Sequence, residues 1–353
     1  MSDKSVTLSD IASHAGVSRA TVARALSEKG YVAKEAKARI EESARLLGYR
    51  PNVLARGLRA KRSFTIGHMA LGITDNPFFA HVARSVEQQA LSVGYKVFLY
   101  NQDETMEHER QGIERFIERQ VDAVIFTYAL DARNLDLLHK ARMPIVQIER
   151  DRSSNTHSVL VDNRPGAEAA MRHLVGLGHR RIAFIGGDAL LNRRSVSRQR
   201  SVEEERLDAY LHVLSEAGVA PDPGLIRLGH YIVRDERGEN VVGYRDTQAL
   251  LQLADRPTAI FTGCDIIAAG AMRALYEARL RIPDDISVVG YDDTLAPMLA
   301  PRLTTVAQPM EELGRTAVQY ALAAIDDPTI TPQHIALPTH LIVRDSTGPV
   351  RKN

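Results

Sequence analysis

The chain has 353 residues, enough for two or three domains, and its 44% hydrophobic and 25% charged residues are ordinary for a soluble globular protein. Its single cysteine, Cys264, excludes an intrachain disulfide, and no apolar run approaches the roughly 18 residues that a membrane span requires. The N-terminus also has no apolar signal-peptide segment, so we expect a cytoplasmic protein without a membrane partner.

Charge is unevenly divided along the chain. Residues 1–62 carry 13 Lys and Arg against 6 Asp and Glu, whereas the remaining residues carry 32 against 38. A basic segment on an acidic body is typical of a nucleic-acid-binding module fused to a module with another role. Charge alone also allows a basic surface that is merely solvated, so the interpretation depends on the pattern within the basic segment.

The segment 7–26, TLSDIASHAGVSRATVARAL, predicts two short helices joined by a tight turn. Thr7 and Asp10 fit a capping box at the start of the first helix, and Ser18 can cap the second. Gly16 stands at the turn, where positive φ is required. Apolar residues at helical spacing give the first helix one buried face: Leu8, Ile11, Ala12 and Ala15. Such a helix-turn-helix places its second helix in the DNA major groove.

A third helix is expected near 34–47, with Gly48 just past its C-terminus. The three helices together predict a small all-α head over residues 1–50. Residues 51–63 then predict a hinge or linker. Within them VLARGLRA, residues 53–60, is a brief helical pattern that contains Gly57. Because so short a helix is marginal in water, we expect it to order only when docked.

From residue 64 the chain alternates strands and helices. Strands are expected at 64–71, 95–100, 122–129, 144–149, 158–162, 181–187, 225–231, 259–263 and 286–293, and helices near 82–93, 108–119, 166–177, 205–217, 244–253 and 266–278. Two such runs predict a core of two doubly wound parallel-sheet lobes. Ligands of these sheets bind beyond the C-terminal strand ends, which here would face each other across a cleft.

Four blocks of sequence, taken in order, resemble the lactose/galactose repressor (LacI/GalR) family. They are the helix-turn-helix from Thr7 to Arg24, GYRPNVLARGL from Gly48 to Leu58, IPDDISVVGYDD from Ile282 to Asp293, and LTTVAQ from Leu303 to Gln308. The resemblance implies a core like that of periplasmic sugar-binding proteins, over residues 64–345, in which the chain crosses three times between lobes. It places the first lobe at about 64–162 and 293–325 and the second at about 163–292 and 326–345.

The resemblance also implies which residues contact DNA. Arg19, Ala20 and Arg24 match positions that reach base edges, and arginine can bond guanine O6 and N7 in bidentate fashion. The alternative for both arginines is contact with phosphates only. Leu58 matches a hinge leucine that wedges between base pairs in the minor groove, or it packs on the protein itself as a linker residue. The remaining expected DNA contacts are Thr7, Ser18, Thr21, Asn52, Ala55 and Arg59, with Ser18 and Thr21 serving as caps or phosphate contacts.

The resemblance also implies that a second set of residues, at the strand ends, holds a small-molecule effector between the lobes. The expected set is Asn76, Phe78, Phe79, Glu149, Arg150, Arg206, Asp265, Asp292 and Gln308. Carboxylates and a forked arginine suit a carbohydrate, because each hydroxyl donates and accepts hydrogen bonds. Asp162 ends a strand, where it either contacts the ligand or orders the crossover.

The sequence departs from the family pattern at Cys264-Asp265, where relatives have Asn-Asp. Cysteine is a poor hydrogen-bond partner, so a direct polar contact at this position is weakened, and we expect the pocket to accept a ligand other than the family's common hexoses. Asp265 is expected to cap the following helix. The basic segment NRRSVSRQR, residues 192–200, is either a solvated loop or a feature that favours an anionic effector.

Other function classes fit less well. No phosphate-binding glycine loop follows a strand and no metal-ligand spacing is present, so neither an enzyme nor a cofactor is expected. A solute-binding protein of a transport or sensing system would explain the lobes but not the basic head. The sequence thus predicts a homodimeric transcriptional regulator, a repressor in preference to an activator, that reads a pseudo-palindromic operator in double-stranded DNA. Inducer and corepressor both fit the pattern.

Overall fold

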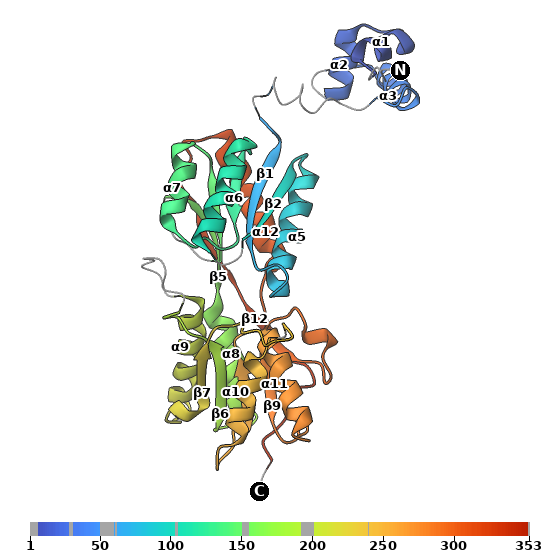
Figure 1. Ribbon diagram of the computed structural model, residues 1–353. Helices are drawn as coiled ribbons and strands as arrows, with labels where there is room; N and C mark the ends of the chain where they lie inside the picture. Colours follow the sequence, from blue (N-terminus) through green and yellow to red (C-terminus); the bar gives the residue numbers. More distant parts are fainter. Residues whose placement is uncertain are drawn as a thin grey trace. The chain divides into compact units, whose positions relative to one another are not determined.

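The computed structural model describes residues 6–27, 31–49, 60, 62–102, 105–149, 155–191, 201–238 and 240–351 (Figure 1). The chain divides into two compact units, residues 1–63 and 64–353. The expected hinge residues 51–59 lie outside the described part of the chain. No helix in the described segments is long and apolar enough to cross a bilayer.

The first unit is the expected three-helix head. Its helices are α1 (Leu8–Ala15), α2 (Arg19–Ser27) and α3 (Lys34–Leu46), and they pack around Ile11, Val22 and Ile40. The Thr7–Asp10 capping box is present, and Gly16 follows α1 with φ of 65°. Ser18 Oγ accepts a hydrogen bond from Thr21 N at 3.1 Å, so it caps α2 as expected.

The first lobe of the second unit is a doubly wound parallel sheet with strand order β11-β5-β4-β3-β1-β2. Its strands are β1 (Thr65–Leu71), β2 (Lys96–Gln102), β3 (Ala123–Phe126), β4 (Ile145–Ile148), β5 (His157–Asp162) and β11 (His334–Pro338). Helices α5 (Pro77–Ser92) and α12 (Met310–Asp326) bury Val82 and Leu313 on one face of the sheet. Helices α6 (Met106–Glu118) and α7 (Ala132–Lys140) bury Phe116 and Leu135 on the other.

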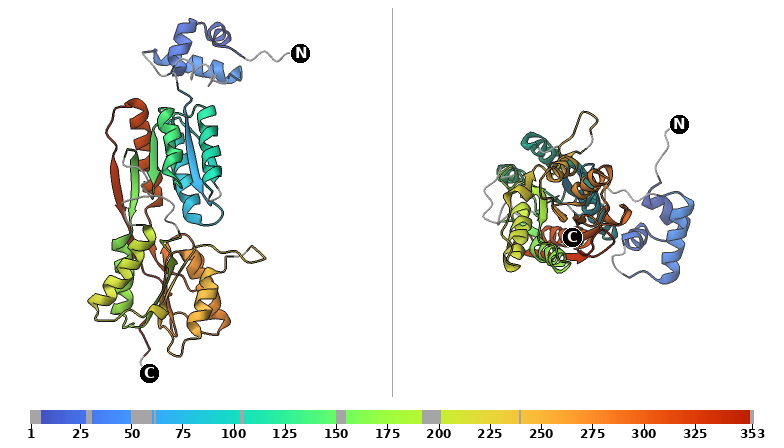
Figure 2. Two further views of the ribbon diagram at one scale, coloured as in Figure 1. Left: turned by 60° about the vertical axis from the view of Figure 1, so that its left-hand side comes forward. Right: turned by 90° about the horizontal axis from the view of Figure 1, so that it is seen from below.

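The second lobe repeats this arrangement with strand order β12-β10-β9-β8-β6-β7, in which only β12 is antiparallel to its neighbour. Its strands are β6 (Ile182–Gly187), β7 (Ile226–Gly229), β8 (Ala259–Thr262), β9 (Ser287–Asp292), β10 (Thr304–Ala307) and β12 (His340–Ile342). Helices α8 (Asn163–Gly176) and α9 (Val202–Glu216) cover one face, and α10 (Val242–Leu251) and α11 (Asp265–Glu277) the other (Figure 2). The 3-10 turns η1 (Pro223–Leu225) and η2 (Ala296–Met298) complete the lobe.

The expected division of the C-terminal residues between the lobes is correct for α12, in the first lobe, and for β12, in the second, but it is wrong for β10 and β11. Residues 293–325 were expected in the first lobe, but β10 pairs with β9 in the second. Residues 326–345 were expected in the second lobe, but β11 pairs with β5 in the first. The chain therefore crosses between the lobes from β5 to α8, from β10 to α12, and from β11 to β12. The number of crossovers agrees with the expectation, and the positions of the last two differ.

A helix crossing in the second lobe offers a test of this packing. A Cβ on Gly243, near the start of α10, would collide with the backbone carbonyl oxygen of Ile267 in α11, so neither helix could keep its position. We expect Gly243→Ala to lower the free energy of unfolding by about 1–3 kcal/mol or more, measured by chemical denaturation. The matched control is Gly176→Ala at the end of α8, where a Cβ meets no atom within 4 Å. Equal stability of the two variants would contradict the described helix crossing.

Candidate functional site

Helix α2 presents a polar face away from the core of the head. Arg19, Ala20 and Arg24 are exposed, whereas Val22 and Ala25 are buried. The exposed three thus occupy the surface that the sequence predicts for base contacts. Thr7, Ser18 and Thr21 take part in the helix caps, since Ser18 Oγ also lies 2.8 Å from Thr21 Oγ1. The other expected DNA contacts, Asn52, Ala55, Leu58 and Arg59, lie outside the described residues.

A cavity in the second unit is lined by residues of both lobes at the C-terminal ends of their parallel strands. Seven of the nine predicted effector contacts line it: Asn76, Phe78, Phe79, Glu149, Arg206, Asp292 and Gln308. Arg150 and the basic segment 192–200 lie outside the described residues. Asp265 does not line the cavity.

The carboxylate of Asp292 joins the two lobes. Asn76 in the first lobe donates a hydrogen bond to its Oδ2 at 3.3 Å, and Gln308, on the crossover after β10, donates to its Oδ1 at 2.6 Å. Asp292 is 1% exposed, and this burial raises its pKa to about 7. The Gln308 Oε1 atom is buried and receives no hydrogen bond from the described residues, so it can accept one from a ligand.

Two residues that line this cavity have a backbone conformation that non-glycine residues rarely adopt. Asp292 has φ of 113° and Glu149, at the end of β4, has φ of 65°, in the region that favours glycine. Such conformations persist only where the surrounding structure enforces them, and they are common at binding sites. The strain at Asp292 and Glu149 therefore supports the assignment of the cavity as a functional site.

Arg206 reaches the cavity from α9, and its guanidinium is held on several sides. Its Nη1 donates to Gly263 O at 2.6 Å, and its Nε and Nη2 both donate to Asn163 Oδ1, at 3.2 and 3.0 Å. Its Cζ lies 3.8 Å from the centre of the Tyr291 ring, in a cation–π contact. Glu205 accepts a hydrogen bond from Asn163 Nδ2 at 2.9 Å and so fixes the Asn163 amide. Arg206 is thereby oriented before a ligand binds.

Asp265 has a structural role that differs from the expected one. Its Oδ2 accepts hydrogen bonds from the backbone N–H groups of Thr294, Leu295 and Ala296 at 2.7–3.3 Å, and its Oδ1 accepts one from Thr305 at 2.7 Å. The carboxylate therefore holds the loop after β9. It does not cap its own helix either, because the N-cap of α11 is Cys264, which makes no side-chain capping bond.

The starts of two helices explain two further residues. Asp162 is the N-cap of α8, where its Oδ1 accepts from Arg164 N at 3.3 Å and it does not line the cavity, which agrees with the expected role of ordering the crossover. The sequence pattern did not indicate Glu203, which lines the cavity in the first turn of α9, because that helix begins at Val202, three residues before its expected start. The Ser201–Glu204 capping box of α9 is the signal that would have revealed it.

Other lining residues that the sequence did not reveal are Tyr128 after β3 and His230 and Tyr231 after β7. Each follows the C-terminal end of a strand, the location that the parallel-sheet rule gives for ligand contacts. The sequence pattern also did not indicate the role of Asn163. Its importance comes from its contact with Arg206, which lies 43 residues further along the chain, and no local pattern marks it.

Known proteins resemble this chain in both units. Residues 7–52 match the family model described as bacterial regulatory proteins, lacI family, and residues 171–347 match the periplasmic binding protein-like domain. The ribose operon repressor of Halalkalibacterium halodurans is 34% identical over 343 residues, which cover 97% of each chain. The chain belongs to the LacI family. The regulator DegA of Bacillus subtilis, 32% identical over 353 residues and 98% of each chain, agrees with this.

Solved structures of LacI-family proteins have the same architecture. The lac repressor dimer bound to operator and the anti-inducer ONPF matches with a TM-score of 0.77 and 28% identity, over 98% of this chain and all of that one. A regulator from Enterococcus faecium with bound ribose matches 81% of this chain and all of its own, with a TM-score of 0.69 and 27% identity. This LacI-family chain is therefore a DNA-binding transcriptional regulator, with its helix-turn-helix in the first unit.

The buried Asp292 predicts a pH dependence of stability. The pKa of Asp292 is about 7 in the folded protein and near 4 in the unfolded chain. The stabilising contribution of its protonated form is therefore complete below about pH 4 and is lost as the pH rises through 7. Asp292→Asn removes this contribution, on the order of 4 kcal/mol at most. We expect the unfolding free energy of the variant to fall less than that of the wild type between pH 5.5 and 8.5.

The control for this measurement is Asp345→Asn. Asp345 is exposed, and its hydrogen bond and ion pair with Arg302 lower its pKa, so its titration lies below the tested range. The Asp345→Asn variant should keep the wild-type slope. If Asp292→Asn also kept that slope, the side chain of Asp292 would already be ionised at pH 5.5 and the predicted effect of burial would be wrong.

Proposed function

We propose that the chain is a homodimeric repressor whose operator affinity changes when a sugar or sugar-like effector binds in the cavity between the lobes. The observation that carries this proposal is the hydrogen-bonded set Asn76, Asp292 and Gln308, which joins both lobes and a crossover at the cavity. Two structural relatives support the ligand class, since one is a CelR–cellobiose complex and the other contains bound ribose.

The chemistry of the polar residues suits a polyol. Ionised Asp292 only accepts hydrogen bonds, Arg206 only donates them, and the amides of Asn76 and Gln308 do both. A ring of hydroxyl groups can satisfy all of these groups at once. A ligand that bonds to residues of both lobes changes the relative free energy of open and closed cores, and it can shift DNA affinity only through that difference.

On the DNA side, two copies of α2 would enter successive major grooves of a pseudo-palindromic operator. Arg19 and Arg24 would contact base edges and Ala20 a thymine methyl group, with Leu58 wedged in the minor groove between them. The lac repressor dimer bound to operator supports this arrangement and the dimeric state. The protein would act in the cytoplasm, where its operator DNA is accessible.

The proposal is tested by a thermal-shift screen of sugars and nucleosides, followed by DNA binding with the compound that stabilises the protein. We expect that compound to change the affinity for the operator. Arg206→Ala should bind operator but lose both responses to the compound, because the variant removes a lining side chain and the cation that Asn163 and Gly263 hold in place at the cavity. Arg315→Ala, an exposed arginine on α12, is the control and should respond normally. A compound that stabilises Arg206→Ala as well as the wild type would contradict the placement of the site.

The DNA contact of Arg24 gives a separate prediction. Arg24→Ala should cost roughly 1–3 kcal/mol on the preferred operator and relax the preference at one base position, because a bidentate contact to guanine is lost. The measurement is a binding-site selection followed by titration on the selected operator. Arg45→Ala, an exposed arginine on α3, is the control and should leave base preference unchanged. If Arg24→Ala selected the wild-type site, Arg24 would contact phosphates and not bases.

A further inference from the structure

The loop after β1 contacts the second lobe at two separate points. Its consecutive residues Asp75 and Asn76 both lie in the first lobe. Asn76 donates its hydrogen bond to the buried Asp292, whereas Asp75 forms an ion pair with Arg234 of the second lobe. Asp75 lines the cavity, and the side chains of this ion pair are 35% and 48% exposed. The ion pair therefore joins the lobes at the solvent-exposed rim of the cavity.

Arg234 belongs to a hairpin over residues 233–241, which projects from the second lobe (Figure 2). Arg234 and Asn240 form an antiparallel bridge, and Gly238 in the turn has φ of 79°, which favours glycine. Residue 239 lies outside the described part of the chain. Arg234 Nη1 donates to Gly238 O at 2.6 Å. The hairpin itself therefore orients the guanidinium that forms the ion pair.

The amide of Asn240 connects the base of the hairpin to the cavity lining. Its Oδ1 accepts hydrogen bonds from Val233 N and Val242 N, both at 3.2 Å, and its Nδ2 donates to Tyr231 O at 3.0 Å. Tyr231 and Ile232 line the cavity, and Val242 is the first residue of α10. One end of the hairpin is thus continuous with a wall of the cavity, and the other end contacts the opposite lobe.

The loop that carries Asp75 is fixed within the first lobe. Asp75 N donates to Gly72 O at 2.8 Å, and Ile73 N donates to Asn101 Oδ1, beside it on β2, at 3.2 Å. Asn76 is the N-cap of α5, so the loop ends directly on a helix. The carboxylate of Asp75 is therefore presented from a backbone that other residues of its own lobe hold in place.

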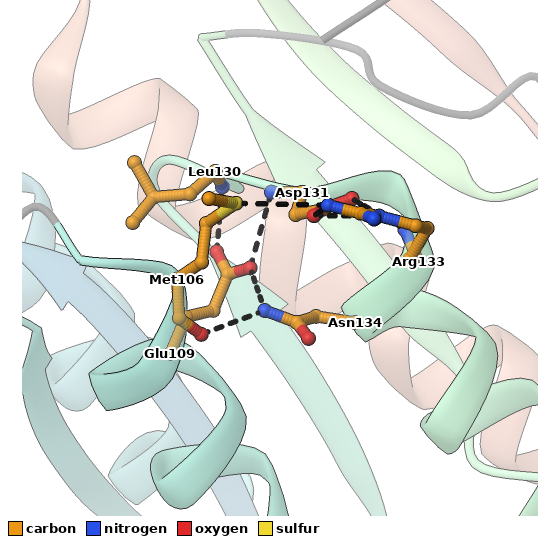
Figure 3. Close-up of polar contacts among 6 residues, drawn as sticks. All are labelled: Met106, Glu109, Leu130, Asp131, Arg133 and Asn134. Carbon is orange, nitrogen blue, oxygen red and sulfur yellow. Dashed lines mark hydrogen bonds and ion pairs between the residues drawn. The ribbon is translucent and has the colours of Figure 1, made fainter. Parts of the chain in front are cut away.

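A second first-lobe segment of the cavity lining, after β3, is also fixed. The buried carboxylate of Glu109 accepts hydrogen bonds from Leu130 N at 2.5 Å and from Asp131 N at 3.1 Å (Figure 3). Asn134 Nδ2 donates to the same carboxylate at 2.9 Å. Burial of a carboxylate is costly unless its oxygens are hydrogen-bonded, so these bonds hold the segment that carries Leu130 into the lining. The first lobe therefore offers a fixed frame to the hairpin.

We propose that the hairpin 233–241 is a flap over the mouth of the cavity, and that the ion pair of Asp75 and Arg234 is the latch that holds it against the first lobe. Opening of the cavity then requires this ion pair to break. An exposed ion pair typically changes an equilibrium constant by no more than about fivefold, so the latch adjusts the frequency of opening and does not seal the cavity. This inference goes beyond the proposed function, because it applies to whatever ligand enters the cavity.

The single cysteine of the chain reports on opening without a known ligand. Cys264 lines the cavity and is 3% exposed, and burial raises the pKa of its thiol. A disulfide reagent attacks only an accessible thiolate, so Cys264 reacts when the cavity opens. The experiment mixes the full-length protein with dithiodipyridine and measures the rate of thiol labelling by absorbance. This reagent is uncharged, so a change of charge at the latch does not attract or repel it.

Arg234→Ala and Asp75→Asn should each raise the labelling rate about two- to fivefold, because opening no longer breaks the ion pair. The charge-swapped double variant, Asp75→Arg with Arg234→Asp, should return the rate toward that of the wild type. Added salt screens the ion pair, so it should raise the wild-type rate and leave the Arg234→Ala rate unchanged. Arg237→Ala, at an exposed arginine in the turn of the same hairpin, is the matched control and should keep the wild-type rate.

Urea below the unfolding transition separates opening of the cavity from global unfolding. A local opening exposes little surface, so its rate of labelling depends only weakly on urea. Wild-type labelling with the urea dependence of global unfolding would overturn the flap, because the cavity would not open in the folded protein. Equal rates in the wild type, Arg234→Ala and Asp75→Asn, or a double variant that labels as fast as the single variants, would overturn the latch. Each of these results leaves the proposed function intact.

Discussion

The second unit of this protein depends on a buried carboxylate that is hydrogen-bonded to residues of both lobes. Asp292 ends a central strand of the second lobe with a strained backbone, and it is bonded by Asn76 from the first lobe and by Gln308 from a crossover. An ionised group in this position is costly unless its bonds are made. The relative position of the lobes and the state of this carboxylate are therefore coupled, so a ligand that competes for its hydrogen bonds acts on both.

Arg206 is also hydrogen-bonded to a residue at a crossover between the lobes. Its guanidinium bonds to Asn163, the first residue of α8, which directly follows β5 at the first crossover. Gln308 stands on the second crossover, between β10 and α12. Two of the three crossovers thus carry side chains that contact the polar residues of the cavity. A closure motion about these segments is the kind of two-state element through which ligand binding changes a distant surface.

The local features of the sequence and the cavity at the strand ends were predicted well, whereas the pairing of two late strands and the partners of Asp265 were not. The capping box at Thr7, the positive φ at Gly16 and the buried strands depend on neighbouring residues or on continuous apolar runs, which the sequence displays directly. The lobe assignment of β10 and β11 was wrong because such short strands are placed by their pairing partners. Asp265 was misassigned because the direction of its carboxylate depends on the loop 294–296, which donates three backbone bonds to it.

Thermodynamic linkage between the cavity and the operator tests the central claim most directly. The dissociation constant of the effector should be measured by calorimetry for the free protein and for its operator complex. If the cavity controls DNA binding, the two constants differ by the same factor by which the effector changes operator affinity, because coupling is reciprocal. Identical effector affinities in the presence and absence of operator would contradict the account.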